Sequence, residues 1–210
     1  MTLFSKTQLF LVLLPLSIFL FSCGNDAPKK LPIIGERLGL TAKGDTIYPT
    51  IPSFTFINQN NDSVSNANFE GKIYVVDFFF THCPTICPKV TAQMLRVHER
   101  FKDSSTLLFL SHTIDPKRDT VDRLKNYAEK LGVSAPKWHF VTGIKEQLYG
   151  IADDYFSIAQ EDPTAPGGFD HSGRLILVDK NRHVRSFCDG TDAKDVDRFM
   201  KDIDALLKEK

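Results

Sequence analysis

The sequence predicts an α/β domain in which a central mixed β-sheet is flanked by helices. Apolar, strand-like segments alternate along the chain with segments whose apolar residues recur at helical spacing. Residues 72–81 are nearly all apolar, which is typical of a central strand that is buried on both faces. Near the end of the chain, two strand-like segments are separated by Lys180-Asn181-Arg182 and followed by an amphipathic segment, which predicts a hairpin and a final helix.

The individual elements follow from the same patterns. The first expected strand, 53–58, ends before a turn, and a helix is expected over 88–101, where apolar residues recur at helical spacing. Gly132 ends a second helix over 120–131. The other expected strands are 106–114, 138–142, 174–179 and 183–188, and the other expected helices are 144–153 and 192–208. This order matches a thioredoxin-like fold, in which reactive thiols sit directly after the first central strand.

The N-terminus has the features of an export signal. Lys6 supplies a weak positive region, an apolar segment covers 9–21, and Leu20-Phe21-Ser22-Cys23 resembles a bacterial lipobox. We therefore expect a lipoprotein signal peptide over 1–22 and a lipid on Cys23. An uncleaved membrane anchor is the alternative, but the apolar segment is shorter than the ~20 residues that a membrane span needs.

The remaining chain divides into a tether and one domain. Residues 23–48 combine proline, glycine and mixed charge, which predicts a lipidated N-terminus with a flexible tether, and 49–210 is long enough for one domain. The expected location is the bacterial cell envelope, with the domain lipid-anchored to a membrane and facing the periplasm. Without Lys6, the chain has 25 basic and 26 acidic side chains, so no basic surface indicates nucleic-acid binding.

The cysteines form one local pair rather than a disulfide scaffold. Of the four cysteines, Cys23 is expected to carry lipid, Cys83 and Cys87 are close together, and Cys188 is left over. A domain stapled by disulfides would need several bridges in a much smaller chain.

The thiol pair is the clearest candidate for chemistry. Cys83 and Cys87 follow the predicted central strand directly, and Pro88 suits the first position of the next helix. The positive end of that helix favours thiolates. Three residues separate the cysteines, a spacing that allows a disulfide and also allows both sulfurs to bind one soft ion, such as Cu(I) or zinc. The residues alone leave metal binding and disulfide exchange open.

Among the six histidines, His171 is the best candidate for a third ligand. It follows the proline- and glycine-rich segment 162–168 and precedes a strand, and long loops that close onto a site often carry functional residues. His82 is expected to turn away from the thiols, and His112 ends a strand from which it could approach them. Packing is the simplest explanation for the other three histidines, His98, His139 and His183.

Four separated motifs resemble the Sco/SenC family over about residues 53–208. They are Thr81-His82-Cys83-Pro84-Thr85-Ile86-Cys87-Pro88, Asp115-Pro116-Lys117-Arg118-Asp119-Thr120, Trp138-His139-Phe140-Val141-Thr142-Gly143 and Asp170-His171-Ser172. That family comprises membrane-tethered, thioredoxin-fold copper proteins that help to assemble cytochrome c oxidase. The order and spacing of the four motifs make the resemblance highly specific.

The resemblance implies roles for individual residues. The copper-binding cysteines of the family fall on Cys83 and Cys87, and its distal histidine ligand falls on His171. Asp115 supports the site or partner docking, or is simply a turn residue. Asp170 could orient His171, or be a solvated loop residue. The sequence departs from the family pattern at Cys188, which we expect to be a small buried side chain rather than a ligand or a disulfide partner.

The function that the resemblance implies is that of a copper chaperone for the dinuclear copper site of cytochrome c oxidase subunit II. A periplasmic thiol reductant and the membrane, reached through the lipid anchor, would be further partners. The alternative is a thiol–disulfide oxidoreductase that reduces cysteines of subunit II or of other periplasmic proteins, because the same two thiols can perform exchange. A peroxiredoxin-type peroxidase is disfavoured, because Thr81 lies only two residues before Cys83 and no proline precedes it in the strand.

Overall fold

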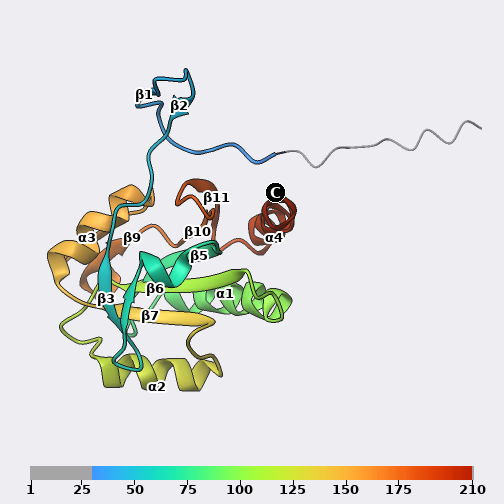
Figure 1. Cartoon of the computed structure of the whole chain (residues 1–210). Coiled ribbons are helices and arrows are strands. Elements are labelled where there is room, and N and C mark those ends of the chain that lie inside the picture. The colour runs from blue at the N-terminus through green and yellow to red at the C-terminus, as the bar shows by residue number, and fades with distance from the viewer. Residues whose placement is uncertain (1–29, 210) are drawn as a thin grey trace, which may run out of the picture.

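The computed structural model describes residues 30–209. A seven-stranded sheet has the order β11-β10-β5-β6-β7-β3-β4, and helices flank it (Figure 1). Its strands are β3 (Thr55–Asn58), β4 (Ser63–Ser65), β5 (Ile73–Phe79), β6 (Leu107–Thr113), β7 (Trp138–Thr142), β10 (Arg174–Val178) and β11 (Val184–Asp189). The helices are α1 (Cys87–Phe101), α2 (Val121–Leu131), α3 (Lys145–Asp154) and α4 (Ala193–Lys208), with short 3-10 turns η1 (Asn66–Phe69) and η2 (Pro166–Gly168). Two small hairpins lie outside the main sheet, β1 (Gly39–Leu40) with β2 (Thr46–Ile47), and β8 (Ala159–Glu161) with β9 (Phe169–His171).

The sheet is mixed, which confirms the predicted fold class. Strands β5, β6 and β7 are parallel, whereas β10 runs antiparallel to β5 and β3 runs antiparallel to β7. Every residue of β5 is buried, because side chains alternate between two covered faces. Phe79 stacks on Tyr127 of α2, whereas Phe78 packs on the opposite face against His112 and Tyr155.

The predicted elements are present with small changes at their ends. Strand β5 ends at Phe79 rather than at residue 81, because Phe80 and Thr81 begin the turn that carries Cys83. Helix α1 begins one residue earlier than expected, at Cys87. The sequence patterns missed β4 and both small hairpins, because strands of two or three residues have too few side chains to show a period.

The N-terminal segment of the described chain packs on the domain. The Ile34 amide donates to the Val184 carbonyl (2.8 Å), and the Leu31 amide donates to Glu209 Oε1 (2.8 Å). Arg185 donates to the carbonyls of Leu31 and Pro32. Residues 31–34, which lie within the expected tether, therefore pack on the domain. The boundary at residue 49 stays a prediction.

The hairpin β1–β2 stands away from the body of the domain (Figure 1). Leu38, just before the hairpin, and Leu40, in β1, are both 67% exposed. The predicted signal peptide and Cys23 lie outside the described residues. Within 30–209, no helix combines the length and apolar character required to cross a bilayer.

Candidate metal centre

The two thiols come from a turn and from the helix that follows it. Cys87 is the first residue of α1, and Pro88 occupies the start of the helix, where a missing N–H costs nothing. Cys83 lies in the preceding turn, in which its amide donates to the Phe80 carbonyl (3.2 Å). The Cys87 amide donates to Cys83 Sγ (3.4 Å), so the beginning of the helix supplies a hydrogen bond to the first thiol.

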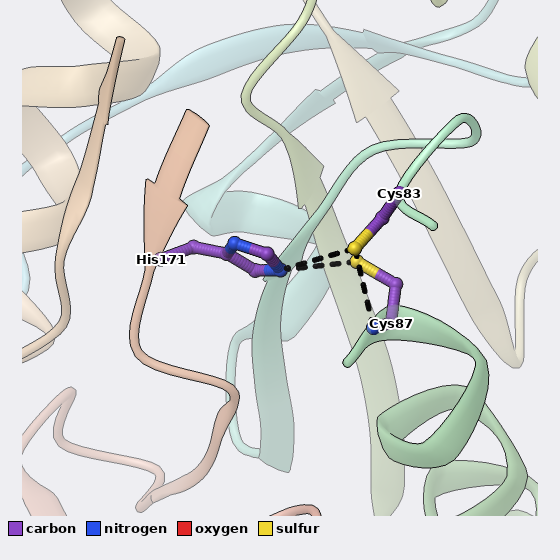
Figure 2. Close-up of side chains that lie close together, drawn as sticks. All are labelled: Cys83, Cys87 and His171. Carbon is purple, nitrogen blue, oxygen red and sulfur yellow. Dashed lines mark hydrogen bonds between the residues drawn. The ribbon is translucent and has the colours of Figure 1, made fainter. Parts of the chain in front are cut away.

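His171 reaches the thiols from a separate part of the chain. It ends β9 and pairs with Ala159 of β8, and Figure 2 shows its ring pointing at both sulfur atoms. Its Nε2 lies 3.1 Å from Cys87 Sγ and 3.9 Å from Cys83 Sγ. All three side chains are buried, and their donor atoms lie within 4.8 Å of one another. The fold therefore brings together the three residues predicted to form the site.

The protonation preferences of the three groups differ. Burial acts to raise the pKa of the Cys83 thiol, but hydrogen bonds from the backbone amides of Thr85 and Cys87 outweigh it, so this pKa lies below its ordinary value. Burial raises the pKa of Cys87, and the neighbouring Cys83 adds to the rise. Burial lowers the pKa of His171, against the opposing charge of Asp170. The group thus combines a thiolate-prone sulfur, a protonated thiol and a neutral imidazole.

This donor set suits one soft metal ion. Two sulfur atoms and one imidazole nitrogen are ligands for Cu(I), Cu(II) or zinc. Donors held at about 2.0–2.3 Å from one ion lie roughly 3–4 Å apart. The observed distances of 3.1 and 3.9 Å between His171 Nε2 and the sulfurs fall in this range. Free Cys83 and Cys87 are also close enough in sequence and space to exchange disulfides.

The side chains of Asp115 and Asp170 both make their contacts away from the three donor atoms. Asp115 forms an ion pair with Arg118 (3.1 Å) in the turn after β6. Asp170 approaches Gln160 Nε2 at 3.5 Å and makes no hydrogen bond to His171. Neighbouring residues of a strand point to opposite faces, so the Asp170 side chain is directed away from the imidazole of the next residue.

The other candidate side chains lie outside the group. His82 is exposed, and His112 is fully buried among aromatic rings. His139 contacts Asn58 (3.2 Å). Cys188 is a free, buried residue of β11 whose pKa is raised by burial, in agreement with the expected packing role.

Comparison with known proteins identifies the family. The SCO1/SenC family model matches residues 43–208. The chain belongs to the SCO1/SenC family. Among its Sco relatives, the SCO1 protein homolog of Bacillus subtilis (strain 168) is 27% identical over 161 residues, which cover 76% of this chain and 83% of the relative.

Solved Sco structures share the fold. A SCO1/SenC family lipoprotein from Bacillus anthracis str. Ames has a TM-score of 0.69 at 26% identity and covers 76% of this chain and 96% of its own. BsSco, a member of the Sco family of cytochrome c oxidase assembly proteins with a disulfide switch, has a TM-score of 0.67 at 25% identity, covering 87% and 100%. Arabidopsis thaliana ScoI with copper bound has a TM-score of 0.63 at 24% identity, and the match covers 75% of this chain and 98% of that structure. This similarity shows a shared fold.

Two features beside the Sco site escaped the sequence analysis. Asp119 is buried and hydrogen-bonded to Thr81, two residues before Cys83. Its place in the motif at 115–120 was a signal, but its partner, 38 residues away, could not be read from the sequence. Gly167 has φ +83°, and a Cβ there would lie 2.8 Å from the Phe80 ring and 3.1 Å from Pro84. The loop before His171 therefore packs closely on the turn that carries Cys83.

Proposed function

We propose that this protein is a copper chaperone that holds one copper ion through Cys83, Cys87 and His171. The observation that carries the proposal is the convergence of these three side chains, with donor atoms within 4.8 Å, from two distant parts of the chain. Soft sulfur donors with one imidazole favour copper, and zinc is the competitor. The copper in the solved structure of a Sco protein with this fold supports the same choice.

The chain's own residues prepare the site for its cargo. Cys83 offers a thiolate-prone sulfur near the turn, and His171 remains neutral, so each can donate an electron pair at neutral pH. Cys87 must lose its proton when the ion binds, because only the thiolate is a good ligand. Copper binding therefore releases protons and weakens as the pH falls.

The proposed cellular role is the assembly of the dinuclear copper site of cytochrome c oxidase subunit II. The description of a similar protein as a cytochrome c oxidase assembly factor supports this role. We place the domain in the bacterial cell envelope, tethered to a membrane by a lipid on Cys23 and facing the periplasm. The lipobox-like sequence at 20–23 and the similar Bacillus anthracis lipoprotein support the anchor. A periplasmic thiol reductant would keep both thiols ready for the ion.

Anaerobic copper titration of the reduced protein tests the proposal. We expect one copper per chain, with strong sulfur-to-Cu(II) absorption that weakens in His171→Ala. Cys188→Ala is the matched control, because it removes a buried thiol outside the group. If the double variant Cys83→Ala, Cys87→Ala binds copper as tightly as the parent, the proposed function is wrong.

The second candidate function is thiol–disulfide exchange. It is favoured by the contrast between Cys83, whose pKa is lowered, and Cys87, whose pKa is raised, because one thiolate can attack while its partner stays protonated. This function predicts reduction of a model disulfide at a rate that His171→Ala leaves unchanged. Weak, non-stoichiometric copper binding together with such reduction would favour the oxidoreductase over the chaperone.

A further inference from the structure

The three donor residues have different kinds of structural support. Cys87 belongs to α1, and His171 belongs to β9, which is paired with β8. Cys83 lies in neither a helix nor a strand, and one backbone hydrogen bond from its amide closes its turn. Additional contacts are therefore needed to hold the backbone just before Cys83, if the first sulfur is to meet the other two donors.

Asp119 supplies those contacts. Its carboxylate accepts hydrogen bonds from the Thr81 amide (3.1 Å), the Thr81 hydroxyl (2.5 Å) and the Thr113 hydroxyl (2.6 Å). The Asp119 side chain has no exposed surface. It joins the turn after β5 to the last residue of β6, and so fixes Thr81 against the sheet.

Arg123 forms further hydrogen bonds to the same turn. Its Nε donates to Thr81 Oγ1 (2.6 Å), and one terminal nitrogen donates to His82 Nε2 (2.8 Å). The same guanidinium lies 3.6 Å from Asp119 Oδ1. Both residues that precede Cys83 are therefore held by the segment that begins α2.

Only a carboxylate satisfies every donor in this cluster. Both oxygens of Asp119 accept hydrogen bonds, and each receives a hydroxyl. An asparagine would place an amide N–H₂ opposite one of these donors, so at least one hydroxyl could no longer donate to the side chain at position 119. Because asparagine keeps the size of the side chain, the change mainly loosens the turn rather than emptying a cavity.

We propose that Asp119 is a positioning residue for the metal centre, acting through Thr81 to place Cys83 within reach of Cys87 and His171. The inference rests on the proposed function and adds to it a residue that touches no donor atom. Loss of a group that is hydrogen-bonded to a metal ligand typically weakens metal binding by about 10- to 100-fold. Asp119 acts through Thr81 rather than on a ligand directly, so we expect an effect near the lower end of this range, about tenfold, in Asp119→Asn.

The experiment compares Asp119→Asn with Asp179→Asn in the reduced mature chain. Asp179 is a matched control: it is buried and accepts two backbone amides (both 2.9 Å) and Arg185 (3.0 Å), but it lies in the hairpin turn after β10. Thermal unfolding measures stability, competition with a copper chelator measures affinity, and the sulfur-to-Cu(II) absorption band reports the geometry of the site. Both variants should lose stability, whereas only Asp119→Asn should lose roughly tenfold or more in affinity and shift the band.

The outcomes separate the inference from the proposed function. If the parent protein binds no copper, the proposed function fails. If the parent binds copper and both variants keep its affinity and band, Asp119 has only a structural role and the inference is wrong. If Asp119→Asn fails to fold, Thr81→Val is the second variant. It removes the hydroxyl that bonds to Asp119 and keeps the hydrogen bond from the Thr81 backbone amide to Asp119. An unchanged affinity and band in a folded Thr81→Val protein would equally overturn the inference.

Discussion

Replacement of Asp77 by asparagine should stabilise the protein at alkaline pH and have little effect at acidic pH. Asp77 lies in the centre of β5 and is 3% exposed. The Ser111 hydroxyl donates to its Oδ1 (2.5 Å) and accepts from Trp138 Nε1 (2.8 Å). Among residues 30–209, no cation forms an ion pair with this carboxylate. The ionised form is therefore poorly compensated.

The magnitude follows from the pKa of Asp77. Burial raises this pKa from 3.8 to about 7, partly offset by the hydrogen bond from Ser111. A carboxyl group whose folded pKa lies above its unfolded value stabilises the protein fully at low pH, and this stability is lost as the pH rises from about 4 to about 7. The ionisation of Asp77 therefore lowers the free energy of unfolding of the parent by about 4 kcal/mol in total, of which about 3 kcal/mol is lost between pH 5 and pH 8. An asparagine side chain at this position has no charge to bury and can still accept from Ser111, so the variant escapes this loss.

Urea unfolding of the reduced, metal-free protein at pH 5 and pH 8 provides the assay. The free energy of unfolding of Asp77→Asn, relative to the parent, should rise by about 3 kcal/mol between the two pH values. Asp103→Asn is the control, because Asp103 is exposed. If the difference between Asp77→Asn and the parent is the same at both pH values, Asp77 ionises freely in the folded protein and the reasoning is refuted.

Three further substitutions test other parts of the fold. His112→Phe should stabilise the protein by about 1–3 kcal/mol at pH 7, because both ring nitrogens are buried without a partner among the described residues. Burial lowers the His112 pKa to about 3, so the parent protein loses stability as the pH falls below 6.5, and the variant should lose less. Urea unfolding at pH 5 and pH 7 measures this difference, and an equal loss in both proteins would contradict the prediction. Gly167→Ala should cost about 1–3 kcal/mol more than Gly168→Ala in thermal unfolding, because both have positive φ but only a Cβ at 167 meets other atoms; equal costs would disprove the close approach. Arg185→Met should cost roughly 3–5 kcal/mol, because it leaves the buried carboxylate of Asp179 and the partly buried carboxylate of Glu209 unpaired. The change should also expose residues 31–34 to protease; unchanged protection would show that this segment is held by other contacts.

The local patterns predicted most of the regular structure. Strand β5, helix α1 and the hairpin of β10 and β11 were recognised because their periods and turn residues lie within short segments. The two-residue and three-residue strands were missed, since so few residues cannot show a period. Leu31, which lies within the expected tether, makes hydrogen bonds with Arg185 of β11 and with Glu209 near the C-terminus, contacts that no local pattern predicts.

The chemistry available to this protein could be predicted from the amino-acid order. Cys83 and Cys87 are neighbours along the chain, and the apolar segment before them and Pro88 after them place both at a strand-to-helix junction. Four motifs in order also indicated the family, which the match over residues 43–208 confirmed.

The assembly of the site from distant residues becomes visible only in the folded protein. His171 lies 84 residues beyond Cys87, and Asp119 lies 38 residues beyond Thr81, so no local pattern carries the distances between them. The motif also places Asp170 next to His171 in sequence, but strand alternation turns the Asp170 side chain away from the imidazole and toward Gln160. Local sequence periods specify which face a side chain occupies, whereas strand pairing and burial specify which distant side chains share that face.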